Sequence, residues 1–277
     1  GDTFGSMSVS ERCSFTLPFV DLLFEVCRIP SPTLEGAKKA FEALSLLIQT
    51  SDDLVAFIYE PLLQAAGGMV LHSAAALSEL LSLCKQHNIL TIADEVMTGF
   101  GRTGTLFASE QLQMPPDIIC MSKGITGGFL PLGATSCTHE IFDSFASLER
   151  KKFFFHGHSY SGNPIACSAG VASFDLLMTE HSQNQRNMIA NKHLAAMEAF
   201  STATHLQHPR SLGTLIAVDV QGSEPTGYHH SRRDEIYQHF IERGILMRPL
   251  GNTIYVLPPY CISEGELDSC YAAMLQL

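Results

Sequence analysis

Charge is scarce in this sequence, and positive charge most of all. Of its 277 residues, 16% are charged and 45% are hydrophobic, and the net charge is −11. So much apolar surface excludes an intrinsically disordered chain. No basic stripe is present, which argues against nucleic-acid binding. We therefore expect a globular protein with a sizeable core and one or two domains.

Metal-binding and membrane-spanning patterns are also missing. The eight cysteines form no Cys-x-x-Cys pair, and the twelve histidines form no His-x-x-x-His pair with carboxylates at ligand spacing. We predict no metal site and no disulfide framework, and we interpret the cysteines as small core residues in a reducing compartment. No apolar run is long and unbroken enough to span a bilayer, so we expect no membrane partner.

Apolar runs alternate with helical patterns through the first part of the chain. Continuous apolar strands that alternate with helices indicate a parallel sheet with helices on both faces, so the predicted fold class is α/β. Strands are predicted at residues 54–59, 89–93, 117–121 and 132–137, and helices at 33–50, 73–87, 163–179 and 184–203.

The alternation of apolar strands and helices ends after residue 203. An α+β pattern follows, which predicts a smaller carboxyl-terminal domain and a division into residues 1–180 and 181–277. Its expected strands are 212–220, 245–248 and 253–257, and its expected helices are 232–243 and 263–275.

Three of the apolar strands end in a group capable of chemistry. These groups are Glu60, Asp94 and Lys123. A charge at one strand end usually just meets solvent. Three together favour a site, because ligands of open parallel sheets bind at the carboxyl ends of the strands.

Lys123 is the candidate nucleophile. A lysine amine can form a Schiff base, as pyridoxal-phosphate chemistry requires. The same chemistry needs a carboxylate against the pyridine nitrogen, and Asp94 can supply it. Val96 would point to the same side as Asp94 if the strand continued, and its side chain could pack on a flat ring.

Two further segments allow two interpretations each. The run HGHSYSGNP, residues 156–164, leads into a helix and could bind phosphate with its hydroxyls and amides, or could be an ordinary helix cap. Arg248 lies among apolar residues. It could bind a carboxylate with its planar guanidinium group, or could be a solvated residue on an edge strand.

Four motifs resemble those of class III, fold-type I, pyridoxal-phosphate aminotransferases in residues, order and spacing. They are EPLLQAAGGM (60–69), ADEVMTGFGRTGTLFA (93–108), SKGITGGFLPLGA (122–134) and HGHSYSGNPIAC (156–167). The resemblance covers essentially the whole chain. It implies the fold-type I architecture, a pyridoxal 5'-phosphate cofactor and transfer of an amino group.

The resemblance also implies roles for the cofactor residues. Lys123 would form the Schiff base and shuttle the proton of the substrate carbon. Asp94 would hold the pyridinium proton, and Val96 would stack on the ring. His158 and Ser159 would reach the phosphate of the neighbouring subunit, which implies a homodimer with shared sites. Some relatives have Pro-Thr here, and the serine keeps the hydroxyl.

The substrate residues follow from the same resemblance. Lys123 would also meet the substrate, with Gly157 beside it. Arg248 would bind a substrate carboxylate, with Tyr255 nearby. Glu60 and Arg102 would have structural roles.

Within the class, the chain most resembles the aminotransferases that use S-adenosyl-L-methionine to convert 8-amino-7-oxononanoate into 7,8-diaminononanoate in biotin synthesis. Met97 stands where many class III relatives carry glutamine, and two further segments fit this subfamily, GDTFGSMSVSER (1–12) and RPLGNTIYVLPPY (248–260). The alternatives are a class III aminotransferase for ornithine or 4-aminobutyrate, and an inactive chain that serves only as a dimer partner. The expected location is cytoplasmic, or mitochondrial in a eukaryote.

The resemblance also raises an expectation about the start of the chain. About a third of a family member should precede Gly1, with a phosphate loop and an aromatic residue for the other ring face. We therefore expect the isolated 277-residue chain neither to bind the cofactor tightly nor to turn over.

Overall fold

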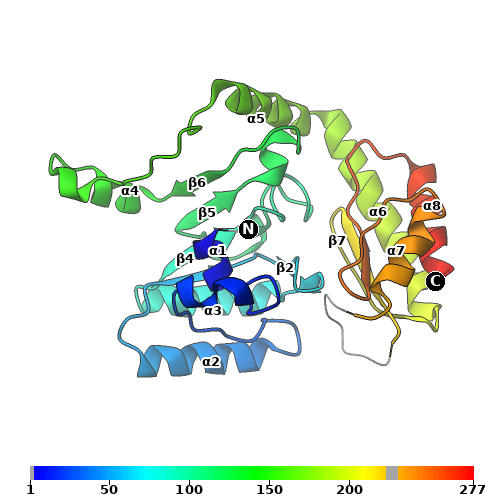
Figure 1. Ribbon diagram of the computed structural model, residues 1–277, viewed down its shortest axis with the longest axis horizontal. Helices are drawn as coiled ribbons and strands as arrows, with labels where there is room; N and C mark the ends of the chain where they lie inside the picture. The colour runs from blue at the N-terminus through cyan, green and yellow to red at the C-terminus, as the bar shows by residue number, and fades with distance from the viewer. Residues whose placement is uncertain (1–2, 223–229) are drawn as a thin grey trace.

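The computed structural model describes residues 3–222 and 230–277 and contains two main sheets (Figure 1). Strands β4 to β6 of the first sheet lie in the middle of the view, above helices α2 and α3. Strand β7 of the second sheet lies at the right with helices α6 to α8. Gly1 and Asp2 of the motif at residues 1–12 fall outside the described residues.

The first sheet is mainly parallel, which confirms the predicted α/β class. Strand β1 pairs in parallel with β4, and β4 pairs in parallel with β5, whereas β6 runs antiparallel to β5. The β5–β6 connection contains only a short 3₁₀ turn, and a parallel pair would need a longer crossover. The strands are β1 (Ala56–Tyr59), β4 (Leu90–Asp94), β5 (Ile118–Met121) and β6 (Ala134–Cys137).

Helices α2 (Ala37–Thr50) and α3 (Ala74–Gln86) cover this sheet near β4. Helix α3 packs against β4, and α2 packs against α3. Ser73 caps α3, because its side chain accepts the Ala76 amide at 3.3 Å. Helix α2 begins later than predicted, since the Thr33 hydroxyl accepts the Gly36 amide and holds a turn there.

Five α-helices and strands of the described residues were absent from the sequence prediction. Four are short, so no apolar period develops along them. They are helix α1 (Phe4–Val9), the hairpin of β2 (Leu63–Gln64) and β3 (Val70–Leu71), and helix α4 (His139–Phe145). The fifth is β7 of the second sheet.

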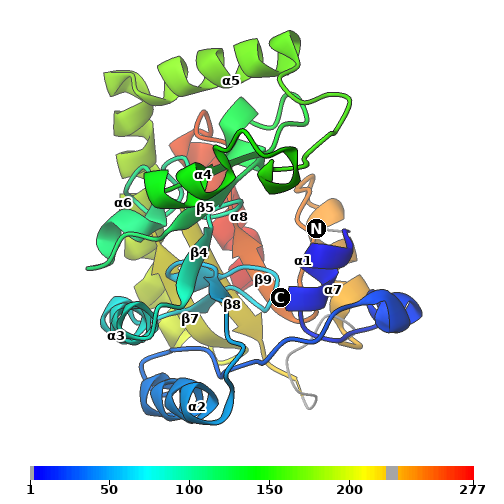
Figure 2. The ribbon, with the colours of Figure 1, turned by 90° about the vertical axis from the view of Figure 1, so that its left-hand side faces the viewer.

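Two long helices join the sheets. Helix α5 (Pro164–Leu177) passes across the top of the molecule, and α6 (Glu180–Thr202) descends beside the second sheet (Figures 1 and 2). Asn163 caps α5 and Thr179 caps α6. Among residues 3–222 and 230–277, no helix combines the length and apolarity needed to cross a membrane.

The second sheet is antiparallel, in the order β7–β8–β9, and is packed by α6, α7 and α8. Its members are β7 (Leu206–Leu212), β8 (Leu215–Val220), β9 (Thr253–Val256), α7 (Arg233–Ile241) and α8 (Glu264–Leu275). The strand predicted over 212–220 is present as β8 from Leu215, but its start was wrong, because the chain reverses at Gly213, whose φ is 56°. The strand predicted at 245–248 is also absent, and that segment is a loop before β9.

The interpretation of the cysteines as core residues was wrong for most of them. Cys84 is buried, Cys120 and Cys270 are half-buried, and the other five are exposed; all eight thiols are free. The apolar runs around Cys137 and Cys167 form β6 and α5, which present much of their surface to solvent.

Candidate active site

The parallel strands bring their carboxyl ends to one edge of the first sheet. Tyr59 of β1 pairs with Ala93 of β4, and Asp94 pairs with Cys120 of β5. The residues that follow these strands therefore emerge together. The expectation that Glu60, Asp94 and Lys123 lie at a common edge is confirmed.

The charges of these three groups act on one another. Burial raises the pKa of the Glu60 carboxyl, the negative charge of Asp94 raises it further, and the Lys123 ammonium group opposes both. The Glu60 side chain also accepts the amide of Ala65 at 2.5 Å. Glu60 thus holds the turn that leads into the β2–β3 hairpin, a structural role.

Asp94 ends β4, and the chain turns directly after it. The alternation argument for Val96 was wrong, because the strand does not continue to that residue. The Val96 amide instead donates to Asp94 Oδ1 at 3.0 Å, and the Val96 side chain lines the same cavity as Lys123. The turn thus ties Val96 to the Asp94 carboxylate.

The neighbouring acid, Glu95, is used to build this turn. It is completely buried and accepts three hydrogen bonds, from the Thr98 hydroxyl at 2.6 Å and from the amides of Ala108 and Ser109 at 3.1 and 2.7 Å. A carboxylate with so many donors is a structural anchor. Asp94, which is half-buried, is left as the acid for chemistry.

Lys123 opens a 3₁₀ turn of residues Lys123–Thr126 at the end of β5. Its φ of 45° is uncommon for a residue with a side chain, and such strain persists only where the surroundings hold it. The Lys123 carbonyl accepts the Gly128 amide at 3.1 Å, and the Ser122 hydroxyl donates to the Leu132 carbonyl at 2.8 Å. The lysine side chain itself is exposed.

A cavity of about 770 Å³ adjoins this turn. Its walls come from the turn after β4, the Lys123 turn, helix α5, the start of α6 and the segment between β9 and α8. Most of the lining is apolar, and the polar lining includes Lys123, Arg102, His181 and Gln185. Ligand sites of proteins are commonly clefts of this size, about 300–1,000 Å³, with a few polar groups.

Gly157, His158 and Ser159 lie apart from this cavity. They belong to the segment between α4 and α5, which projects to the left in Figure 1, and all three are exposed. The first amides of α5 already donate to Asn163 Oδ1, at 2.9 and 3.2 Å, so the interpretation as an ordinary cap describes the helix start. A phosphate contact from His158 or Ser159 would therefore be directed outward, to another molecule.

Arg248 and Tyr255 lie near each other in the second sheet region. Arg248 is exposed on the loop before β9, and Tyr255 is half-buried on β9 itself. Burial raises the pKa of the Tyr255 hydroxyl, and the positive charge of Arg248 opposes that rise. Neither residue lines the cavity, although Leu257 and Tyr260 of the same segment do.

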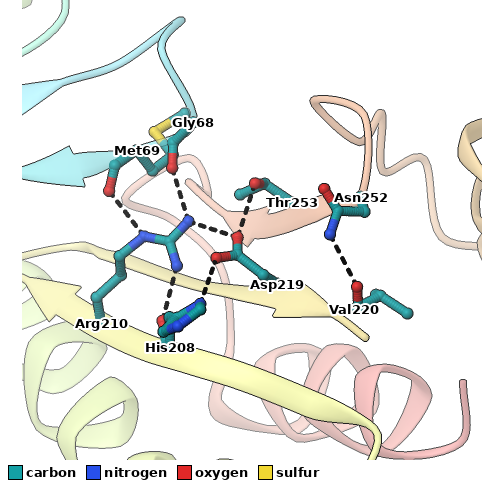
Figure 3. A network of polar contacts seen from close by, with 8 residues as sticks. All are labelled: Gly68, Met69, His208, Arg210, Asp219, Val220, Asn252 and Thr253. Carbon is teal, nitrogen blue, oxygen red and sulfur yellow. Dashed lines mark hydrogen bonds and ion pairs between the residues drawn. The ribbon is translucent and has the colours of Figure 1, made fainter. Parts of the chain in front are cut away.

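Sequence reasoning missed the polar contacts that join the β2–β3 hairpin to the second sheet (Figure 3). Arg210 Nε donates to the Met69 carbonyl at 2.8 Å, and its Nη2 donates to the Gly68 carbonyl at 2.6 Å and to Asp219 Oδ1 at 2.8 Å. The Thr253 hydroxyl donates to the same Asp219 oxygen at 2.7 Å. These bonds fix the β2–β3 hairpin, which follows Glu60, onto the second sheet. The sequence signal was a single acid, Asp219, inside an otherwise apolar strand.

The chain matches known proteins along its whole length. The family model described as aminotransferase class-III matches residues 1–277. The chain belongs to the class-III aminotransferase family.

The adenosylmethionine-8-amino-7-oxononanoate aminotransferase of Synechococcus elongatus is 42% identical to this class-III chain, over 100% of the chain and 66% of that protein. The enzyme of the same name from Helicobacter pylori is 36% identical, over 100% and 64%. The crystal structure of the Methanocaldococcus jannaschii enzyme of that name superposes with a TM-score of 0.89 at 30% identity, covering 100% of this chain and 66% of that one. The chain thus spans about two thirds of the length of these relatives.

Proposed function

We propose that this chain carries the reactive lysine of a pyridoxal-phosphate-dependent aminotransferase. The observation that carries the proposal is the placement of Asp94 and Lys123 after neighbouring parallel strands, at the edge that borders the cavity. Family membership supports the same reaction class.

The residues at this edge fit the chemistry of pyridoxal 5'-phosphate. An exposed primary amine stands at one strand end and a half-buried carboxylate at the next. Val96 and Met97 give the cavity an apolar wall against which a flat ring could pack. Lys123 would hold the aldehyde carbon, Asp94 the ring nitrogen, and Val96 one face of the ring. When bound, the cofactor supplies an electron sink for the substrate carbon.

The chain's own groups then have defined tasks. With the cofactor bound, the Asp94 carboxylate, which the Val96 amide holds in place, would keep a proton on the ring nitrogen. The free amine of Lys123 would take the proton from the substrate carbon as a general base. It would then give up that proton as a general acid. Arg248 would bind a substrate carboxylate, with Tyr255 nearby, and Gly157 would lie beside the substrate bound at the partner's lysine.

The substrates follow from the relatives. The two relatives above carry the name adenosylmethionine-8-amino-7-oxononanoate aminotransferase. We infer that this protein transfers an amino group from S-adenosyl-L-methionine to 8-amino-7-oxononanoate in biotin synthesis. A likeness of 26% identity to an ornithine aminotransferase of Plasmodium falciparum keeps ornithine as the second candidate donor.

A second copy of this chain is the proposed partner. His158 and Ser159 project away from the cavity, and the segment around them exposes Phe153, Phe154 and Phe155. An exposed cluster of this kind is typical of protein interfaces. In a homodimer, His158 and Ser159 would contact the cofactor phosphate bound at the partner's lysine. We also propose the division into domains 1–180 and 181–277, because the second sheet's core cluster lies entirely within the latter.

Chemical trapping tests the role of Lys123. The chain is mixed with saturating pyridoxal phosphate, reduced with borohydride and mapped by peptide mass spectrometry. Borohydride fixes even a transient adduct, so tight binding is not required. We expect the label on Lys123, its loss in Lys123→Ala, and its retention in Lys151→Ala. A label that avoids Lys123 in the unaltered chain contradicts the proposal.

Donor choice tests the substrates. The donors are added to a form of the protein that binds pyridoxal phosphate. S-adenosyl-L-methionine should decrease the absorbance of the bound cofactor in its aldehyde form, and ornithine should not. Arg248→Met should weaken the response to the donor without reducing the label on Lys123. A stronger response to ornithine would favour the second candidate.

A further inference from the structure

Tyr260 is connected to the turn that carries Lys123, although the two residues come from different sheet regions. Tyr260 follows β9, and its hydroxyl donates to the Phe100 carbonyl at 2.8 Å. Phe100 lies in the turn after β4, and both residues line the cavity that Lys123 lines. The bond thus joins the second region to the turn after Asp94.

Phe100 is held in an uncommon conformation. Its φ of 59° is left-handed, which is unfavourable for a residue with a side chain and persists only where the surroundings hold it. Two contacts impose it. Tyr260 binds the carbonyl, and the Phe107 ring packs edge-on at 5.4 Å between centroids. Loss of the first contact would let the turn relax.

The Phe100 ring in turn limits the position of Gly124, the residue after Lys123. A Cβ atom on Gly124 would lie 2.9 Å from Phe100 Cδ2 and 3.0 Å from Phe100 Cβ. Only a residue without a side chain fits against this ring. The ring therefore sets how closely the Lys123 turn approaches the turn after Asp94.

Tyr260 is itself held by two arginines. The guanidinium carbon of Arg102 lies 4.5 Å from the centre of its ring, and that of Arg186 lies 5.6 Å away. Arg102 donates to the Pro258 carbonyl at 2.7 Å, and Arg186 donates to the Leu177 carbonyl at 2.9 Å. These contacts hold the ring where its hydroxyl reaches the Phe100 carbonyl, with the Thr214 side chain also beside that hydroxyl.

We propose that Tyr260 is a positioning residue for the reactive lysine. Acting through the Phe100 carbonyl and the Phe100–Gly124 contact, it holds the Lys123 turn at the distance from Asp94 that the cofactor requires. This inference rests on the proposed function of Lys123. It also means that the second region, which carries Arg248 and Tyr255, is joined to the lysine.

The variant Tyr260→Phe removes the hydroxyl and keeps the ring that contacts the two arginines. A lost hydrogen bond of ordinary strength corresponds to about a two- to tenfold change in a local equilibrium. We expect hydrogen exchange in the peptide covering residues 123–129 to quicken by that factor without any cofactor present. The concentration of pyridoxal phosphate that half-labels Lys123 should rise by a similar factor.

Tyr271→Phe is the matched control. The Tyr271 hydroxyl lies 2.7 Å from His193 Nδ1 in the core of the second region, so this variant also loses one buried hydrogen bond. It should destabilise the chain to a similar degree and leave exchange at residues 123–129 unchanged. If both variants quicken this exchange equally, Tyr260 acts only through global stability and the inference fails.

A second pair tests the Gly124 contact. Gly124→Ala places a methyl group against Phe100 and should weaken cofactor capture at least as much as Tyr260→Phe does. Gly133→Ala is the control, because the nearest atom to its added Cβ is at 3.8 Å. Unchanged capture in Gly124→Ala overturns the inference. Failure of the unaltered chain to be labelled at Lys123 would count against the proposed function instead.

Discussion

The first region of this chain is the β1–β4–β5–β6 sheet with the elements up to α5, and the second region is the β7–β8–β9 sheet with helices α6 to α8. The two regions are packed to different degrees. Every residue of β8 is buried, and one cluster of fifteen buried residues unites the second sheet with helices α6 to α8. In the first sheet, every residue of β5 is only half-buried, and the buried clusters beside it have four or five members. The second region thus completes its own core, whereas the first does not.

The less complete burial of the first region indicates where the molecule could contact another protein surface. Large apolar side chains are exposed on the first region's α4, on α5 and on the segment between them. A monomer rarely leaves so much apolar surface in one place. The proposed catalytic groups, Asp94 and Lys123, belong to the first region, so we expect the active site and the interface to form together.

The largest expected effect tests the core of the second region. Phe200 is completely buried, and Phe200→Ala should lower the free energy of unfolding by about 3–5 kcal/mol. Phe129 of the first region is 84% exposed, so Phe129→Ala should change it by less than about 0.5 kcal/mol. Urea denaturation of the two variants and the unaltered chain makes the measurement. Equal losses would remove the contrast between the regions.

The next effect concerns the bonds between the regions. Arg210→Met leaves the Asp219 carboxylate buried without its cation and frees the carbonyls of Gly68 and Met69, so we expect a loss of about 3 kcal/mol. Adding Asp219→Asn should recover part of this loss, because the uncompensated charge is gone. Arg232→Met, which breaks a partly exposed pair with Glu235 and one bond to the Gln221 carbonyl, should cost at most about 1 kcal/mol. A loss in Arg210→Met no larger than in Arg232→Met would show that the buried pair adds nothing.

The third effect is a pH dependence of the second region. Burial lowers the pKa of His193 to about 4, although its ring nitrogens lie 2.7 Å from the Tyr271 hydroxyl and 3.1 Å from the Thr214 carbonyl. Unfolded, the ring takes up its proton near pH 6.5. The stability contributed by the neutral ring is therefore complete above about pH 6.5 and is lost as the pH falls toward 4, by on the order of 3 kcal/mol.

His193→Gln should remove that slope, as judged by unfolding free energies at pH 7 and pH 4.5. Glu60 of the first region gives the comparison, because burial raises its pKa. A raised carboxyl pKa adds stability below the unfolded value and loses it as the pH rises. Glu60→Gln should therefore flatten a slope of the opposite sign. If the free energy of unfolding depended on pH in the same way in both variants, the opposite signs assigned to His193 and Glu60 would be wrong.

The sequence predicted the site edge well because the relevant signals are local. Each of β1, β4 and β5 is an apolar run that ends at a charge, and parallel pairing aligns those ends without further information. Longer helices such as α3 were also predicted, because their period is visible over several turns and Ser73 marks the start of α3.

The missed features depend on contacts between distant segments. The bond from Tyr260 to Phe100 joins residues that are 160 positions apart, and Arg210 meets carbonyls about 141 positions away. No periodic pattern encodes such pairs. The cysteines were misjudged for a related reason. An apolar run predicts burial only where something covers it, and much of α5, including Cys167, is exposed in this chain.

The smallest expected effect on stability tests that uncovered surface. Leu148 of the first region and Leu246 of the second are both highly exposed, at 102% and 84%. Neither Leu148→Glu nor Leu246→Glu should change the free energy of unfolding by more than about 0.5 kcal/mol, because neither packs in a core.

Self-association should separate the two variants. If a second copy covers the segment between α4 and α5, a buried carboxylate at position 148 would be desolvated there, which costs at least about 1.4 kcal/mol, or tenfold in the dissociation constant. Leu246→Glu lies in the region that completes its own core and should associate like the unaltered chain. Sedimentation equilibrium over a range of chain concentrations measures both. Equal weakening would mean that the interface extends over the second region, and no weakening in Leu148→Glu would mean that this segment does not meet a second copy.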